Sequence, residues 1–149
     1  MKSARIYPPT IFLGSVIAIL VLHFFLPLAK IIPVPWNFIS FVPLFVGAGI
    51  NVLADNIFRR AGTTVKPFEE SKQLIRTGPY QLSRNPMYLG FVLILVGLAI
   101  LLGSLTPFRV IFLFVNSINR GFIKVEEQML SEKFSLEWRE YSGKVRRWI

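Results

Sequence analysis

The chain has 149 residues, 53% of them hydrophobic, and a formal net charge of +9. A soluble domain of this size rarely combines that hydrophobicity with 14 phenylalanines and three tryptophans, so we expect one membrane domain over 1–149, its basic excess facing lipid rather than nucleic acid. The absence of cysteine excludes disulfides and thiolate ligands, and a single histidine with few carboxylates argues against a bound metal.

Four hydrophobic segments follow one another along the chain. Since roughly 20 apolar residues cross a bilayer, the first three are long enough to span it, at about 10–28, 36–54 and 87–105. The sequence PLA at 27–29 is a poor cleavage site, so we interpret the first segment as a retained helix rather than a signal peptide. The fourth, at 107–122, is shorter, and GSLTP at 103–107 predicts a tight turn that makes the last two segments a helical hairpin.

The placement of basic residues supports four spans. With four, the N-terminus, the loop at 55–86 and the tail at 124–149 share one side of the membrane, which the positive-inside rule makes cytoplasmic. Lys30 lies on the other side and Arg109 begins segment four. Of the 17 basic residues, 15 lie on the cytoplasmic side: Lys2, Arg5, Arg59, Arg60, Lys66, Lys72, Arg76, Arg84, Arg120, Lys124, Lys133, Arg139, Lys144, Arg146 and Arg147. The compact chain fits a prokaryotic inner membrane.

The tail after segment four carries a helical apolar stripe. Its large apolar residues recur at gaps of three and four: Leu130, Phe134, Trp138, Tyr141, Val145 and Trp148. With basic residues on the opposite face, this pattern predicts an amphipathic helix lying on anionic lipid. Gly143 is a possible break before its last turn.

The stretch RTGPYQLSRNPMYLG, at 76–90, has two interpretations. It is either a helix start, with Asn85 as N-cap and Pro86 in the first turn, or a binding site. A helix N-terminus attracts an anion through its free N–H groups, and Arg84 beside it can clamp a carboxylate or phosphate. Tyr80 and Tyr88 offer rings to a cation or an adenine.

A second polar group is Glu126-Glu127, between segment four and the tail. Neighbours in a helix point about 100° apart, so one carboxylate can face a pocket while the other pairs with a base. A ribose hydroxyl pair or a sulfonium would suit the first. Other polar residues in or near the spans are interpreted as structural: a mid-span His23, an Asp55–Arg59 pair, and Asn116 with Asn119.

Together these motifs resemble those of the small integral-membrane methyltransferases that include isoprenylcysteine carboxyl methyltransferase and phospholipid N-methyltransferase. The matching text is TTV at 63–65, LIRTGPYQLSRNPMYLG at 74–90, EEQML at 126–130, Phe134, Tyr141 and the closing VRRWI. The resemblance covers about the C-terminal two-thirds, and the first two segments match in hydropathy alone. Isoprenylcysteine enzymes usually have His where this chain has Asn85, which bears on the acceptor rather than on the cofactor.

The resemblance implies an all-α membrane fold that uses S-adenosylmethionine as methyl donor. It implies a cofactor site formed by Gly78, Tyr80, Arg84, Asn85, Pro86, Tyr88, Gly90, Glu126 and Glu127. Arg84 and Glu126 would also act in catalysis, on a small apolar or lipid-like acceptor that enters from the bilayer. A carboxylate or thiolate acceptor needs no general base, and none is obvious in the sequence, which favours these over an amine.

Two other functions fit parts of the sequence. Some sterol reductases have a similar C-terminal membrane fold and bind a nicotinamide cofactor, but they are longer than this chain. A non-catalytic membrane scaffold would use RNPMY as a helix cap and the tail as a lipid-binding helix. A scaffold predicts that Arg84 and Glu126 contribute to no ligand affinity, whereas a methyltransferase predicts that each does.

Overall fold

The computed structural model describes residues 7–63 and 71–149, and within them every regular element is helical. The elements are α1 (Pro8–Phe25), a 3₁₀ turn η1 (Trp36–Ser40), α2 (Phe41–Arg60), a 3₁₀ turn η2 (Gly78–Gln81), α3 (Pro86–Leu102), α4 (Thr106–Ile118), a π-helical turn η3 (Asn119–Ile123) and α5 (Lys124–Lys144). The predicted all-α class is confirmed. Several residues used above lie outside the described ranges: Lys2, Arg5, Lys66, and Thr64 with Val65 of the TTV motif.

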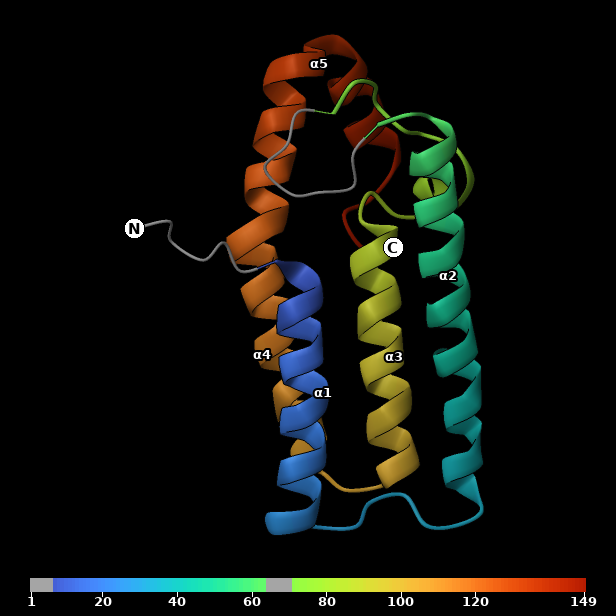
Figure 1. The fold of residues 1–149 in the computed structure, drawn as a ribbon, viewed down its shortest axis with the longest axis vertical. Helices are drawn as coiled ribbons and strands as arrows, with labels where there is room; N and C mark the ends of the chain where they lie inside the picture. The colour runs from blue at the N-terminus through green and yellow to red at the C-terminus, as the bar shows by residue number, and fades with distance from the viewer. Residues whose placement is uncertain (1–6, 64–70) are drawn as a thin grey trace.

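Helices α1 to α4 run side by side along the long axis, and α5 caps one end (Figure 1). Helix α3 packs mainly on α2, and α1 packs mainly on α4. Two helical stretches in the described ranges are long and apolar enough to cross a membrane, Pro8–Phe25 and Trp36–Arg60. Helix α3 is apolar but shorter, at 17 residues. Two of the expected spans therefore meet the length criterion, and the four-span arrangement stays a prediction.

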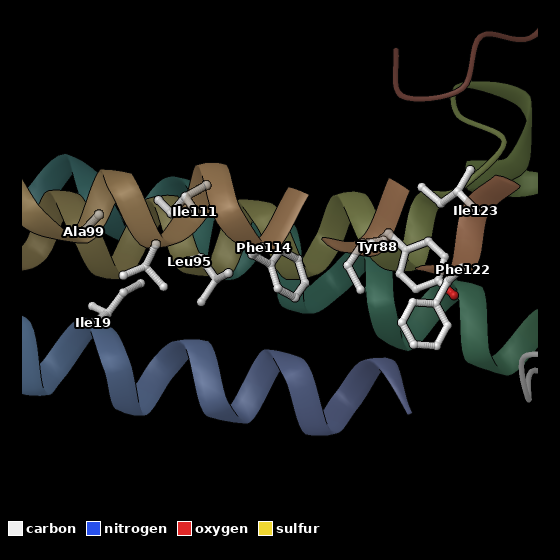
Figure 2. Close-up of a cluster of buried hydrophobic side chains, with 10 residues drawn as sticks. Ile19, Tyr88, Leu95, Ala99, Ile111, Phe114, Phe122 and Ile123 are labelled. Carbon is white, nitrogen blue, oxygen red and sulfur yellow. The ribbon is translucent and has the colours of Figure 1, made fainter. Parts of the chain in front are cut away.

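The buried core forms where α1, α3 and α4 meet. Ile19, Leu95 and Phe114 each expose 2% of their surface or less, and Figure 2 shows them pointing toward one another. Toward α5 the same cluster continues through Phe122 and Ile123. The core thus reaches from the middle of the bundle to the base of α5, where the polar motifs lie.

Glycines allow α2 and α3 to approach closely. A Cβ atom on Gly47 would lie 2.6 Å from the carbonyl oxygen of Gly90, and one on Gly90 would lie 2.7 Å from the Asn51 amide nitrogen. Small residues at such a crossing are typical of helix pairs in membranes. Helix α3 ends at Leu102, and the following Gly103 has a φ of +72°, which favours glycine and produces the predicted turn into α4. A Cβ atom on Gly103 would also lie 2.5 Å from the Ile32 carbonyl oxygen.

Some helices extend beyond the predicted hydrophobic segments, because polar residues continue the helical backbone. Helix α2 extends past the predicted position 54 to Arg60, because the Asp55–Arg59 ion pair lies within the helix, as expected. The fourth segment is α4 followed by η3, and it continues into α5 without a loop. His23 hydrogen-bonds Ser104 at 2.7 Å, which ties α1 to the α3–α4 turn and supports its structural interpretation.

The tail does not continue as a single straight helix. Ser135 has non-helical backbone angles inside α5 (φ 11°, ψ −79°), so the apolar stripe changes direction there. Beyond it Trp138 and Tyr141 are buried against the rest of the protein rather than left on an open helix face. Helix α5 ends at Lys144, one residue beyond the predicted break at Gly143. The continuous interfacial helix is therefore not confirmed.

Candidate functional site

A cavity of about 830 Å³ lies between the start of α1, the segment that contains η2, the N-terminus of α3, and α5. This volume lies within the range of about 300–1,000 Å³ that is common for small-molecule sites. It brings together the two polar motifs of the sequence. Seven of the nine predicted site residues line it: Tyr80, Arg84, Asn85, Pro86, Tyr88, Glu126 and Glu127.

Asn85 occupies the predicted position before α3, but its side chain does not cap the helix. Its amide nitrogen donates instead to the carbonyl oxygen of Arg147, at 3.1 Å. The Ser83 hydroxyl donates to the same carbonyl at 3.2 Å and accepts the Asn85 N–H at 3.1 Å. A tertiary partner has replaced the local capping bond, so the first N–H groups of α3 have no side-chain cap.

The Arg84 side chain forms a largely buried wall of the cavity, with 16% of its surface exposed. Its Nη1 lies 3.4 Å from a Glu127 oxygen, and its guanidinium carbon lies 5.4 Å from the ring centroid of Trp138. Its Nε is buried and has no hydrogen-bond partner within the described residues. A buried N–H of a cation without an acceptor costs free energy, which an anionic ligand would recover.

The two adjacent glutamates have different partners. Glu127 accepts two bonds from Arg147, at 3.1 Å from Nε and 2.5 Å from Nη2. This contact raises the pKa of Arg147, which keeps the ion pair charged. Glu126 accepts the Tyr88 hydroxyl at 2.7 Å and has no ion-pair partner in the ranges that the structure covers. Burial raises the pKa of Glu126, and the Tyr88 hydrogen bond opposes that effect only in part.

Aromatic side chains form the wall near η2. The Tyr141 hydroxyl donates to the carbonyl oxygen of Tyr80 at 2.6 Å, and burial raises the pKa of Tyr141 to about 12. The Tyr80 ring lies 5.4 Å from that of Phe58 on α2, and Trp138 lies 5.9 Å from Tyr141. These rings offer flat apolar surfaces on which an aromatic ligand can stack.

Gly78 and Gly90 lie outside the cavity lining. Gly78 has a φ of +61° at the start of η2, and a Cβ there would lie 2.6 Å from the Ile57 side chain. Gly90 is in the α2–α3 crossing described above. Packing and backbone conformation account for both glycines, and their predicted part in the cofactor site stays a prediction. Asn116 bonds its own helix, at the Phe112 carbonyl, and is also outside the site.

Several residues at the site were missed in the sequence. Phe58 and Met129 line the cavity from α2 and α5, with no local signal to mark them. Trp138 was placed on a lipid-facing stripe, because helical periodicity does not reveal the break at Ser135. Arg147 was counted with the basic tail, and only its proximity to Glu127 and Asn85 distinguishes it from Arg146.

Comparison with known proteins gives one family and two similar chains. The family model described as phospholipid methyltransferase matches residues 36–137. The protein-S-isoprenylcysteine O-methyltransferase of Saccharomyces cerevisiae is 45% identical over 84 residues, which are 54% of this chain and 34% of the yeast protein. An uncharacterized protein of Haemophilus influenzae is 40% identical over 63 residues, 42% of this chain and all of its own length. The match thus spans about a third of the yeast enzyme, and no solved structure matches the chain.

Proposed function

Because this chain belongs to the phospholipid methyltransferase family, we propose that it is an S-adenosylmethionine-dependent membrane methyltransferase whose donor binds in the cavity between Arg84 and Glu126. The observation that carries the proposal is the juxtaposition in one cavity of two side chains: a buried guanidinium with an N–H that no described residue accepts, and a carboxylate with no cation partner among the described residues. A ligand with both an anionic and a cationic group would satisfy both at once. Family membership favours this function over a reductase or a scaffold.

The residues fit the donor group by group. Arg84 and the uncapped N–H groups of α3 would hold its carboxylate. Glu126 would face its positive charge or its ribose hydroxyls, and Glu127 would order the wall through its bonds to Arg147. The aromatic wall near Tyr80 would take the adenine.

When bound, S-adenosylmethionine supplies an electrophilic methyl group on a sulfonium. The protein's part is to hold an acceptor in line and to exclude water. Glu126 is a candidate base that the sequence did not make obvious, because its partly buried carboxylate lies on the cavity wall and burial raises its pKa. A proton-bearing acceptor such as an amine is therefore as compatible with the site as a carboxylate or thiol.

We place the acceptor among small apolar or lipid-like molecules that enter from the bilayer. The name of the yeast relative specifies an isoprenylcysteine, and the family's name specifies a phospholipid. Exposed apolar side chains on α1 and α2, among them Phe24 and Phe45, give the bundle a lipid-compatible surface. We propose four spans in a prokaryotic inner membrane, with the cavity on the cytoplasmic side.

Calorimetric titration of S-adenosylmethionine into the purified protein in nanodiscs tests the donor. We expect saturable binding that Arg84→Gln weakens by about 10- to 100-fold, the scale of a hydrogen bond to a charged group. Arg139→Gln is the matched control, because it removes the same charge from an exposed position on α5. Equal affinity in the two variants, or no binding by the wild type, would exclude the proposal.

A further inference from the structure

We infer that Arg147 is a positioning residue that neutralises Glu127 and so keeps Arg84 available for the carboxylate of the donor. The inference rests on the proposed function. It concerns a residue beyond the range of the family match, which ends at residue 137. Arg147 does not line the cavity and acts through the neighbouring side chains.

The residues after α5, 145–149, form a segment that we call the strap, and it lies across the start of α3. After α5 ends, Val145 adopts an extended conformation, and the carbonyl of Arg146 accepts the Arg84 N–H at 3.0 Å. The next carbonyl, that of Arg147, accepts bonds from Ser83 and Asn85. Figure 1 shows the C-terminus beside the start of α3. Three backbone-directed bonds therefore fix where the Arg147 side chain begins.

From that position the Arg147 guanidinium holds both Glu127 oxygens, whereas Arg84 reaches one of them at 3.4 Å with a single nitrogen. Both partners are at least partly shielded from water, with 15% of the Glu127 side chain and 37% of the Arg147 side chain exposed. The two-bond contact is the stronger by geometry. Glu127 is thus bound mainly by Arg147, and the buried Nε of Arg84 stays without an acceptor among the residues that the structure describes.

Charge leads to the same conclusion. Arg84, Arg147 and Glu127 together carry a net single positive charge beside the cavity. Without Arg147 the remaining pair would be neutral, and Arg84, which lies 3.4 Å from a Glu127 oxygen, would compensate that carboxylate. A partly buried carboxylate left alone with one arginine would bind it tightly. The anion-binding group of the site would then be occupied by the protein itself.

A double-mutant cycle tests this inference through the affinity for S-adenosylmethionine. We expect Arg147→Gln to weaken binding about tenfold or more, as for loss of a charged contact. Adding Glu127→Gln should restore it, because Arg84 is released again. Affinity of the double variant should come within about twofold of Glu127→Gln alone, the usual scatter of additive changes.

Arg146→Gln is the matched control, since it removes the same charge from an exposed position on the same strap and keeps the backbone bond to Arg84. It should bind like the wild type. Arg147→Lys keeps the charge without the two-bond geometry and should lie between the wild type and Arg147→Gln. If Arg147→Gln does not fold, the lysine and double variants still test the inference.

The outcomes separate this inference from the proposed function. A wild-type protein that does not bind the donor overturns both. Binding by the wild type with equal affinity in Arg147→Gln and Arg146→Gln overturns the role of Arg147 and leaves the donor site intact. A loss in Arg147→Gln that Glu127→Gln does not restore shows that the strap only supports the fold, and it also overturns the inference.

Discussion

At the scale of single residues, Glu126 and Glu127 show how position decides the role of identical side chains. Glu127 is neutralised by Arg147 and lies near Arg84, whereas Glu126 has a tyrosine hydroxyl as its hydrogen-bond partner. Burial raises the pKa of Glu126, so its charge is held at a cost in the free protein. A site that keeps an uncompensated charge for its ligand is less stable without that ligand.

This cost predicts that Glu126→Gln melts at a higher temperature than the wild type at neutral pH, while it binds the donor more weakly. A raised folded-state pKa adds stability below the unfolded value of about 4.5, and that stability is lost as pH rises through the folded pKa. The advantage of the variant should therefore shrink as pH falls through the raised folded-state pKa, and it should be gone below about 4.5. Thermal unfolding from pH 4 to pH 8 measures it.

Glu140 provides a control, because its pKa is shifted in the opposite direction to that of Glu126. Its bond to Lys144 lowers the pKa of this exposed carboxylate, so its contribution is present above the unfolded pKa and disappears as pH falls through the folded pKa. Glu140→Gln should give no stabilisation at neutral pH. If both variants show the same pH dependence, the effect of Glu126→Gln comes from net charge and not from its position in the cavity wall.

At the scale of elements, the contact between α2 and α3 depends on glycine. The backbones of Gly47 and Gly90 approach so closely that a methyl group on either would meet the carbonyl oxygen of the other within 2.8 Å. The crossing sets the position of the first turns of α3, which carry Pro86 and Tyr88 into the cavity. The motif glycine at 90 thus affects the site through helix packing.

We expect Gly90→Ala to destabilise the protein by about 1–3 kcal/mol, the usual cost of overpacking. Gly14→Ala is the matched control on α1, where a Cβ would meet no atom within 4 Å. There the better helix propensity of alanine should leave stability unchanged or raise it by up to about 1 kcal/mol. Unfolding in detergent measures both, and equal stability of the two variants would contradict the packing role of Gly90.

At the scale of the whole molecule, the bundle separates an apolar body from one polar end. The cavity, α5 and the strap lie at one end of the long axis, and the 26–40 loop lies at the other (Figure 1). Lys30 bridges to Ser104 in the α3–α4 turn and Arg109 lies near the start of α4, whereas Arg84 lines the cavity and Arg147 binds Glu127 in its wall. A bilayer around the body would place the cavity at its surface.

Single cysteines can test this orientation cleanly, because the chain has none. We expect a membrane-impermeant maleimide to label Lys30→Cys in spheroplasts, and to label Gln73→Cys and Lys144→Cys only after permeabilisation. Gln73 and Lys144, which the proposed orientation places on the cytoplasmic side, flank α3 and α4 in the sequence. Labelling of Gln73→Cys and Lys144→Cys from opposite sides would show that these helices do not form a membrane hairpin.

The sequence by itself determined the helical class, the approximate helices and the two motifs of the site. These depend on local physics: apolar runs form helices in lipid, Pro86 begins one, and Gly103 allows the chain to turn. Seven of the nine predicted residues reached the cavity because each motif is a short segment at a helix end. Gly78 and Gly90 do not line the cavity, and a glycine needed for packing is indistinguishable in sequence from one that touches a ligand.

The tertiary structure alone decided which partners these residues meet. Asn85 bonds the Arg147 carbonyl rather than its own helix, and Trp138 faces Arg84 after the break at Ser135. Periodicity cannot reveal such contacts, since they join residues far apart in the chain. Charge patterning likewise counted Arg147 as one of many basic residues. Its two bonds to Glu127 exist because the strap folds back over the start of α3, and that long-range packing leaves Arg84 without a full partner of its own.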